Sequence, residues 1–310
     1  MRTVTDAASN VANQDQPPEV FWDALFRDSK DRVVAAPALP APVADTHCHL
    51  DMLHYPELAL ARAAAHGVDF IVTVVDPTED PAYTYDNLKA WQTASEQIVA
   101  QLPAPQLRVL IGCHPHNASR YDAAIEAEML ARLGDTRSAG IGEIGLDYHY
   151  DHSPRDVQRE VFARQLQLAV EQNLPVALHL REAHHDGLAI LREAGTPAAG
   201  TLLHCFNLDF ATLEPFLELG CMVAFGGPLT FKKSEEVRQA ARLTPPERIV
   251  TETDAPFMAP HPVRGVICGP EHTVYTAARL LEAFGHPDPT SPQAALLLQQ
   301  FHENARAFFS

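Results

Sequence analysis

Histidines and carboxylates recur in this chain of 310 residues, each at the end of a short apolar segment. The first pair is His47 and His49 in the stretch 45–51, DTHCHLD. Side chains alternate between the two faces of a strand, so residues two apart point the same way and these imidazoles can hold one ion together. An isolated His-x-His pair is more often a polar strand end. Here, however, similar residues end the later apolar segments: His114, His116, Glu143, His179, His204 and Asp254.

Glu143 favours a metal over a purely structural explanation. It lies in the apolar and glycine-rich run 141–146, IGEIGL. An ionised carboxylate in such surroundings loses several kcal/mol of hydration unless a partner replaces the water. A divalent cation is such a partner, and a carboxylate has two oxygens that can bridge two ions roughly 3.5–4 Å apart. Histidine and carboxylate ligands suit Zn, Mn, Fe or Co, and the neighbouring Cys48 and Cys205 are expected to point to the opposite face, as core residues.

Strand-like and helix-like segments alternate from residue 43 onwards. Helical spacing is clearest at 155–172, where Ser153 is expected to cap the helix and Pro154 to occupy its first turn. Continuous apolar strands need cover on both faces, so this α/β pattern predicts a closed (β/α)8 TIM barrel with its functional residues at the C-terminal strand ends. The alternative, an open doubly wound sheet, lacks a Gly-x-Gly-x-x-Gly after the first strand. The expected strands are 43–48, 68–75, 107–112, 139–144, 174–180, 200–206, 221–226 and 248–253.

The chain divides into an N-terminal extension, 1–42, and a single barrel domain, 43–310. Residues 1–18 are polar and predicted to be disordered. The apolar residues of 19–26 predict a short helix that docks on the barrel. Residues 35–42 contain three prolines and are expected to form an extended connector.

Charge and cysteine content restrict the partners and the compartment. With 23 Lys and Arg against 40 Asp and Glu, the net charge is -17, so a phosphate substrate must be bound locally against a repelling overall field. Five cysteines without a Cys-x-x-Cys pair favour reduced thiols. The start of the chain lacks the apolar segment of a signal peptide, and no apolar run approaches the ~20 residues of a membrane span. We therefore expect a cytoplasmic protein without membrane contact and without an obligate protein partner.

Six ordered motifs resemble those of the TatD-like metal-dependent hydrolases, the TatD DNase family within the wider amidohydrolase group. The resemblance implies a TIM barrel that holds a pair of divalent ions (Zn, Mg, Mn or Fe) and, most often, 3′ to 5′ exonuclease activity on DNA. By this likeness His47, His49 and Asp254 hold one metal, His179 and His204 hold the other, and Glu143 bridges them. The motifs are DTHCHLD at 45–51, GCHPH at 112–116, GEIGLDY at 142–148, LPVALHLREAH at 174–184, HCF at 204–206 and ETDAPFMAP at 252–260.

Two further comparisons with the family patterns matter. Related barrels often bridge their metals with a carbamylated lysine, but the four lysines here (30, 89, 232 and 233) lie away from the fourth strand, which leaves that role to Glu143. Asn207-Leu208 stands where the family usually has Ser-Gly, and Cys268-Gly269 where it has Asn-Glu. Both departures fall in loops and affect the expected substrate preference, not the expected metal ligands.

Catalytic and substrate-binding roles follow from this ligand set. A divalent ion activates water at neutral pH, Glu143 and Asp254 are the expected catalytic residues, and Asp254 is expected to orient the water and carry its proton. His114, Arg181, Tyr148 and Arg264 are expected to contact substrate. The alternatives are a turn-stabilising role for His114 and His116 around Pro115, solvated arginines, and a loop anchor at Tyr148.

Three classes of function fit the sequence. The first is hydrolysis of a phosphodiester such as single-stranded DNA. The second is hydrolysis of an amide or a small ester, for example an aminoacyl ester, because the same activated water can attack a carbonyl. The third is a metal-binding barrel without turnover, which the complete set of expected ligands disfavours.

Overall fold

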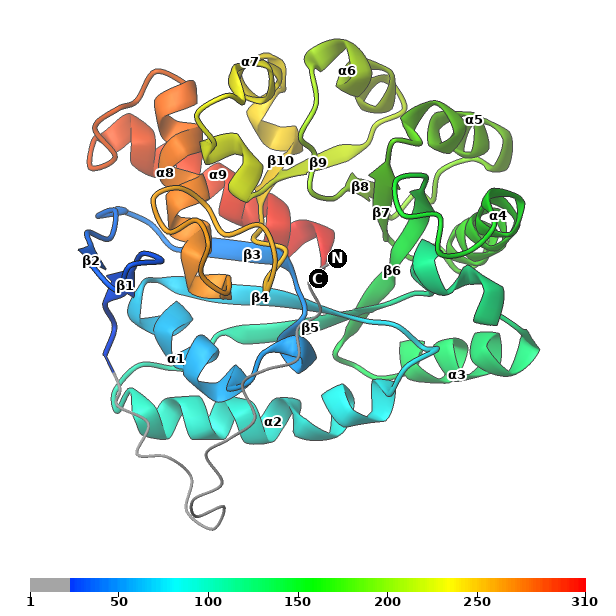
Figure 1. The fold of residues 1–310 in the computed structure, drawn as a ribbon, viewed down its shortest axis with the longest axis horizontal. Coiled ribbons are helices and arrows are strands. Elements are labelled where there is room, and N and C mark those ends of the chain that lie inside the picture. The colour runs from blue at the N-terminus through cyan, green and yellow to red at the C-terminus, as the bar shows by residue number, and fades with distance from the viewer. Residues whose placement is uncertain (1–22) are drawn as a thin grey trace.

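Eight parallel strands form a barrel in the computed structural model, which describes residues 23–310 (Figure 1). Neighbouring strands follow one another in chain order from β3 to β10, and each strand is followed by a helix on the outer surface. The prediction of a (β/α)8 TIM barrel is therefore confirmed. The barrel strands are β3 (Val43–Cys48), β4 (Val68–Val75), β5 (Gln106–Ile111), β6 (Ser138–Asp147), β7 (Val176–Arg181), β8 (Thr201–Leu203), β9 (Met222–Phe225) and β10 (Ile249–Thr251).

The outer helices pack apolar stripes on the barrel, and α4 has the expected bounds. Ser153, however, does not cap α4: its buried hydroxyl donates to the carbonyl of His116 and accepts from the amide of Ser119, so it ties two loops together. Pro154 is itself the N-cap residue and lies just before the first turn, in which it was expected. The α-helices are α1 (Pro56–Ala65), α2 (Pro81–Ile98), α3 (Ala123–Leu133), α4 (Arg155–Gln172), α5 (His184–Ala194), α6 (Phe210–Glu218), α7 (Glu235–Leu243), α8 (Thr273–Ala283) and α9 (Pro292–Phe308). None of the described helices has the length and apolar content required to cross a bilayer.

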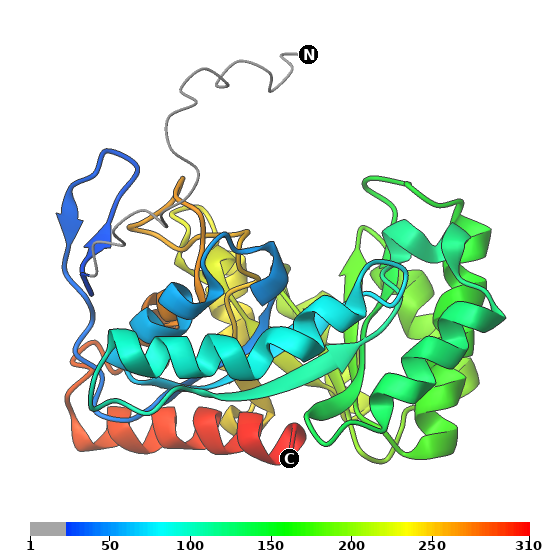
Figure 2. The same cartoon turned by 90° about the horizontal axis from the view of Figure 1, so that it is seen from below.

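The barrel interior is a packed core of mainly small and branched side chains. Ala44, Ala177 and Ala224 alternate with larger residues such as Phe70 and Leu110, and all are buried. Inward-facing side chains of a closed eight-stranded barrel must fill a narrow space, which explains this mixture of sizes. Helix α9 runs along one end of the barrel (Figure 2), and Phe309, just after it, joins the same core.

Side-chain hydrogen bonds help to close the seam between β3 and β10. Thr46 donates from its hydroxyl to the carbonyl of Thr251 at 3.0 Å, and Thr251 donates to the carbonyl of Ala44 at 2.6 Å. The buried carboxylate of Asp45 accepts from both the amide and the hydroxyl of Thr253, at 2.8 and 2.6 Å. These contacts fix the first and last strands where the expected ligands lie.

The described part of the N-terminal extension is not helical. It forms a two-stranded antiparallel hairpin, β1 (Phe26–Arg27) with β2 (Val33–Val34). Phe26 is buried, with its ring stacked on His66 at 4.2 Å and edge-on to Tyr275 at 5.0 Å. The prediction of a helix over 19–26 is thus wrong for 23–26, where packing of one aromatic residue fixes the chain, and its remainder lies outside the described residues. The predicted disorder of residues 1–18 also falls outside them.

Candidate metal centre

Glu143 reaches the barrel mouth through an irregularity in β6. Between Ile141 and Ile144, β6 contains one residue more than the facing part of β7, so the strand bulges at Gly142-Glu143. A bulge redirects a side chain locally. Gly145 is also required, because its φ is +146° and an added Cβ would lie 2.0 Å from the carbonyl oxygen of His179. The motif GEIG therefore has a backbone role as well as a carboxylate.

The two oxygens of Glu143 face different sets of histidines. Oε1 lies 2.5 Å from Nδ1 of His179 and 2.8 Å from Nε2 of His204. Oε2 lies 3.3 Å from Nε2 of His47 and 3.9 Å from Nε2 of His49. The carboxylate therefore stands between two groups of nitrogen donors, one from the first barrel strand and one from the middle of the chain.

Asp254 joins this cluster from the loop after β10. Its Oδ1 lies 3.7 Å from Nε2 of His49 and 4.0 Å from Nε2 of His47. The Asp254 amide donates to the carbonyl of His47 at 2.8 Å, and the amide of His49 donates to the carbonyl of Ala255 at 2.7 Å. All six residues expected as ligands thus converge at one barrel mouth.

The chemistry of the cluster fits divalent cations. His47 is fully buried, and neither of its ring nitrogens has a hydrogen-bond partner, although Nε2 lies near Glu143. Buried polar atoms are normally paired, so an orphaned imidazole that faces carboxylates needs an explanation, and a metal ion supplies one. Three groups of potential ligand atoms lie close enough to share an ion: His47 with His204 and Asp254, His47 with His49 and Glu143, and His114 with Glu143 and His179.

Two carboxylates that the sequence analysis left without a role lie behind the histidines. Glu252 is fully buried; its Oε1 lies 3.4 Å from Nδ1 of His204 and accepts from the amide of Cys205 at 2.6 Å. Asp147 accepts from His116 at 2.8 Å and lies 3.3 Å from Nε2 of His179. Such partners orient metal-binding imidazoles. Both residues stand inside quoted motifs, so their position at strand ends was the signal that could have identified them.

Electrostatics favour an ionised Glu143. Burial by itself would raise the pKa of this carboxyl group, but His204, His47 and the other surrounding imidazoles together hold it well below its usual range. Conversely, burial opposes a charge on His204, yet Glu143 and Glu252 raise its pKa well above the ordinary value. Burial lowers the pKa of His47. The site therefore keeps a negative charge at its centre with at least one neutral imidazole available beside it.

His114 stabilises the turn at Pro115, as one of the alternatives held, and also faces the carboxylate of Glu143. Nδ1 of His114 accepts from the amide of His116, which stabilises the turn at Pro115. The opposite nitrogen, Nε2, lies 3.8 Å from Oε1 of Glu143. Burial holds the pKa of His114 well below its usual value, so this ring is neutral. His114 therefore lies within the cluster of potential ligands, and its contact with substrate stays a prediction.

The other expected substrate contacts lie outside the cluster. Tyr148 donates from its hydroxyl to Asp186 at 2.7 Å and packs beneath Arg155, an arrangement that anchors the loop after β6. Arg181, at the end of β7, is exposed and covers the ring of Tyr150 at 4.7 Å. Arg264 is exposed in the loop after β10 and stacks on Phe231 at 4.0 Å.

The neighbouring cysteines and the two departures from the family patterns lie around this site. Cys48 is fully buried and points to the outer core, as expected, whereas Cys205 is partly exposed. The potential ligand groups among residues 23–310 contain no cysteine. Asn207 is exposed near the mouth. At Gly269, an added Cβ would lie 2.2 Å from the carboxylate of Glu271. The side chain of Glu271 therefore occupies the space that a side chain at position 269 would need.

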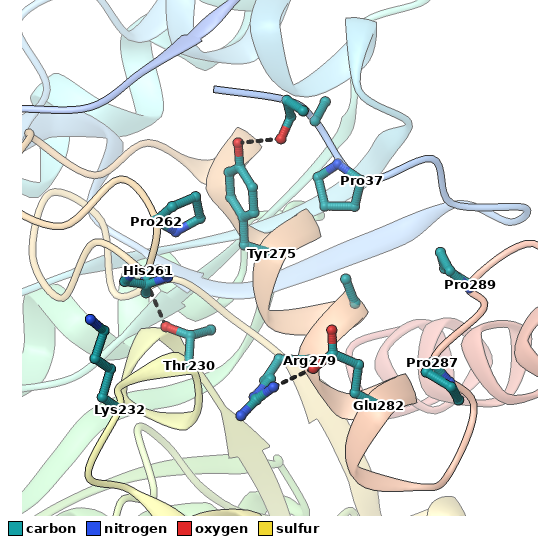
Figure 3. Close-up of a pocket in the computed structure, with 13 residues that line it drawn as sticks. Pro37, Thr230, Lys232, His261, Pro262, Tyr275, Arg279, Glu282, Pro287 and Pro289 are labelled. Atoms are coloured by element: carbon teal, nitrogen blue, oxygen red, sulfur yellow. Dashed lines mark hydrogen bonds and ion pairs between the residues drawn. The ribbon is translucent and has the colours of Figure 1, made fainter. Parts of the chain in front are cut away.

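A separate cavity of about 530 Å³ lies beside α8 and contains none of the six expected ligands (Figure 3). Its wall includes Tyr275, whose hydroxyl donates to the carbonyl of Ala35, and Thr230, whose hydroxyl accepts from the amide of His261. Prolines and the Arg279–Glu282 ion pair complete much of the lining. The cavity lies between residues of the N-terminal extension, helix α8 and the loops that follow β9 and β10.

The chain resembles known proteins over most of its length. It is 35% identical over 244 residues to YabD of Bacillus subtilis, an uncharacterized metal-dependent hydrolase, covering 77% of this chain and 89% of YabD. It is 31% identical over 288 residues to the human 3′-5′ RNA nuclease TATDN2, covering 88% of this chain but 36% of that protein. The crystal structure of YJJV, a TatD homolog from Escherichia coli, superposes with a TM-score of 0.75 at 26% identity, covering 86% of this chain and 97% of YJJV. The sequence profile described as TatD related DNase matches residues 44–310, so this chain belongs to the TatD family.

Proposed function

We propose that this protein is a metal-dependent phosphodiesterase that shortens a nucleic acid strand from its 3′ end, with DNA as the expected substrate. One observation carries the proposal: the two oxygens of Glu143 face two different groups of histidines. A bridging carboxylate between two sets of donors is the arrangement that a two-metal hydrolase needs.

The proposed ligand assignment is the one that the family resemblance implies, and the distances from Glu143 to the four histidines support it. His47, His49 and Asp254 would hold one ion, His179 and His204 would hold the other, and Glu143 would bridge them. When bound, two divalent ions would lower the pKa of water and polarise a phosphoryl group. His114 lies near Oε1 of Glu143 and would approach the substrate at the second site.

Asp254 is the proposed proton carrier. Its carboxylate is half-buried at the mouth, and burial would raise its pKa, but the facing ring of His49 and the charges of nearby histidines lower it. Asp254 is therefore ionised at neutral pH and can accept a proton at Oδ1. An acceptor at the mouth can take the proton of an attacking water and later deliver it to the leaving oxygen.

Family membership supports nucleic acid as the substrate class. The matching profile is described as TatD related DNase, and the human relative is named a 3′-5′ RNA nuclease. Both names concern phosphodiester bonds within a strand. The choice between DNA and RNA rests on the loops around the mouth, where this chain departs from the family patterns at Asn207-Leu208 and Cys268-Gly269.

The proposal is tested with protein loaded in turn with Zn, Mn, Mg or Fe and compared with chelator-treated protein. The substrates are 5′-labelled single-stranded DNA, the matching RNA, a small phosphodiester and an aminoacyl ester. We expect a ladder of strands shortened at the 3′ end that appears only with metal. Hydrolysis of the aminoacyl ester alone would favour the ester alternative, and no turnover of any substrate with metal bound would favour a barrel without catalysis.

A further inference from the structure

Three side chains on the rim of the mouth form an arrangement that core packing does not explain. Tyr150 is 51% exposed, and its ring is parallel to that of His152, with an interplanar angle of 2° and 5.5 Å between centroids. The guanidinium of Arg181 lies 4.7 Å from the centroid of Tyr150. We call Tyr150, His152 and Arg181 the rim platform.

One histidine ring separates the rim platform from the metal centre. His116 lies edge-on to Tyr150 at 5.5 Å and to His152 at 4.6 Å. Its Nε2 lies 2.8 Å from Oδ2 of Asp147, the oxygen that also faces Nε2 of His179 at 3.3 Å. The rim platform is therefore in contact with His116, whose ring centroid lies 6.3 Å from that of His179 in the cluster.

The chemistry of the rim platform suits a nucleotide. Exposed aromatic rings stack unpaired bases, and each stacked base contributes about 1–3 kcal/mol without requiring a particular sequence. Arg181 adds a fixed positive charge that can pair with phosphate. In a chain with a net charge of -17, a local cation beside an aromatic surface is needed to hold an anionic strand.

We propose that the rim platform binds the base and phosphate of the nucleotide adjoining the reacting phosphodiester in a single-stranded nucleic acid. The inference rests on the proposed function and names the subsite that gives it preference for nucleotides. A base inside a duplex has both faces covered, so this subsite selects single strands. Tyr148, although part of the recognised motif, is held by Asp186 and does not join the rim platform.

Binding is measured first, because it does not depend on turnover. The probes are fluorescein-labelled single-stranded oligothymidine and oligouridine with phosphorothioate linkages, titrated with the metal-loaded full chain. We expect Tyr150→Ala to raise Kd roughly 5- to 100-fold for both probes, and Tyr150→Trp to restore binding. Tyr83→Ala, which removes a tyrosine of similar exposure (48%) on α2, is the matched control and should leave Kd unchanged.

Hydrolysis then tests where the base lies. We expect Tyr150→Ala to raise KM for a normal strand but not for a strand with abasic sites in its last two positions. Equal Kd for wild type and Tyr150→Ala, or an equal effect on the abasic strand, would overturn the rim platform. If wild type binds the probes through Tyr150 but hydrolyses no phosphodiester, the proposed function fails while the subsite stands. If wild type does not bind the probes, the subsite is refuted.

Discussion

The two sides of the metal centre hold their histidines by different means. On the β3–β10 side, backbone hydrogen bonds fix the chain: the carbonyl of His47 accepts from Asp254, and the amide of His49 donates to Ala255. On the β6–β8 side, carboxylates face the second ring nitrogens, Asp147 at His179 and Glu252 at His204. Barrel closure positions one set of donors, and buried side chains orient the other.

This difference predicts separable effects of substitution. On the β3–β10 side, changes to the residues that close the seam, as distinct from the ligands themselves, should act through the stability of the seam. Changes to Asp147 or Glu252 should act through metal affinity, because these side chains orient imidazole rings without closing the barrel. Glu143 belongs to both sides.

Replacing Glu143 is expected to have the largest effect. Glu143→Gln removes the central charge and one oxygen acceptor, so bound metal should fall and kcat/KM should drop by roughly 10³-fold or more. Metal analysis and the nuclease assay measure both, with circular dichroism to verify folding. Full metal content with unchanged turnover would show that Glu143 does not bridge the two groups of metal ligands.

Asp254→Asn tests the proton carrier on the β3–β10 side. The amide retains one oxygen near His49 but cannot accept a proton, so we expect partial retention of metal with kcat lowered roughly 10²- to 10⁴-fold. Single-turnover rates measured at saturating metal separate chemistry from occupancy. An unchanged rate would refute the role of Asp254.

Asp147→Asn and Glu252→Gln test the carboxylates on the β6–β8 side. Each should weaken metal binding by roughly 10- to 100-fold, because the facing imidazole loses its orienting partner. Titration with a competing chelator reads the affinity directly. Asp186→Asn serves as the control, since Asp186 contacts Tyr148 away from the cluster; an equal loss in that variant would indicate a general structural effect.

Thr253→Val tests the seam. The hydroxyl of Thr253 donates to the buried Asp45 at 2.6 Å and accepts from the amide of Ala255 at 3.1 Å. Leaving these groups unpaired should lower the free energy of unfolding by about 1–3 kcal/mol, as measured in urea. Thr253→Ser keeps the hydroxyl and should lose clearly less. A comparable loss of stability in both variants would show that the hydrogen bonds of the Thr253 hydroxyl do not cause it.

A smaller pH effect is expected at α5, which begins with His184 and His185. His184 packs edge-on to Phe206 and Phe216, and burial together with the charge of His179 lowers its pKa to about 4. Between about pH 6.5 and 4 the unfolded chain binds a proton that the folded chain does not, so stability falls as the pH drops through this window.

The contribution of His184 is isolated by comparison with its neighbour. Over that window we expect about 1–3 kcal/mol of its stability to disappear in wild type, and His184→Gln to remove this part of the pH dependence. His185 is 97% exposed at its side chain, so His185→Gln should leave the dependence intact. Urea unfolding at pH 7.5 and pH 5 measures the difference, and identical pH dependence in all three proteins would contradict it.

The strands and the ligand types were predictable because their signals are local. Apolar β-branched runs mark β4 at 68–75, and its bounds match the structure. The alternation of strands with helices predicts the barrel, and the barrel predicts that polar residues at strand ends meet. Strand β8 was expected over 200–206 but spans only Thr201–Leu203. It is shorter because the residues from His204 onwards leave the sheet.

Other features depended on partners distant in sequence. The hairpin at Phe26 forms where a helix was expected, because its ring packs on His66 and Tyr275. Tyr148 and Tyr150 have the same local chemistry, yet the first is held by Asp186 and the second is exposed on the rim. No periodicity in the sequence separates them.

The sequence by itself determined the donor atoms, their order and the strand ends that carry them, since composition and alternation are properties of short segments. Only the tertiary structure decided that Oε1 of Glu143 faces His179 and His204 while Oε2 faces His47 and His49. The physical reason is that closing the barrel brings β3 beside β10. The extra residue in β6 then turns the carboxylate of Glu143 into the space between the two groups of histidines.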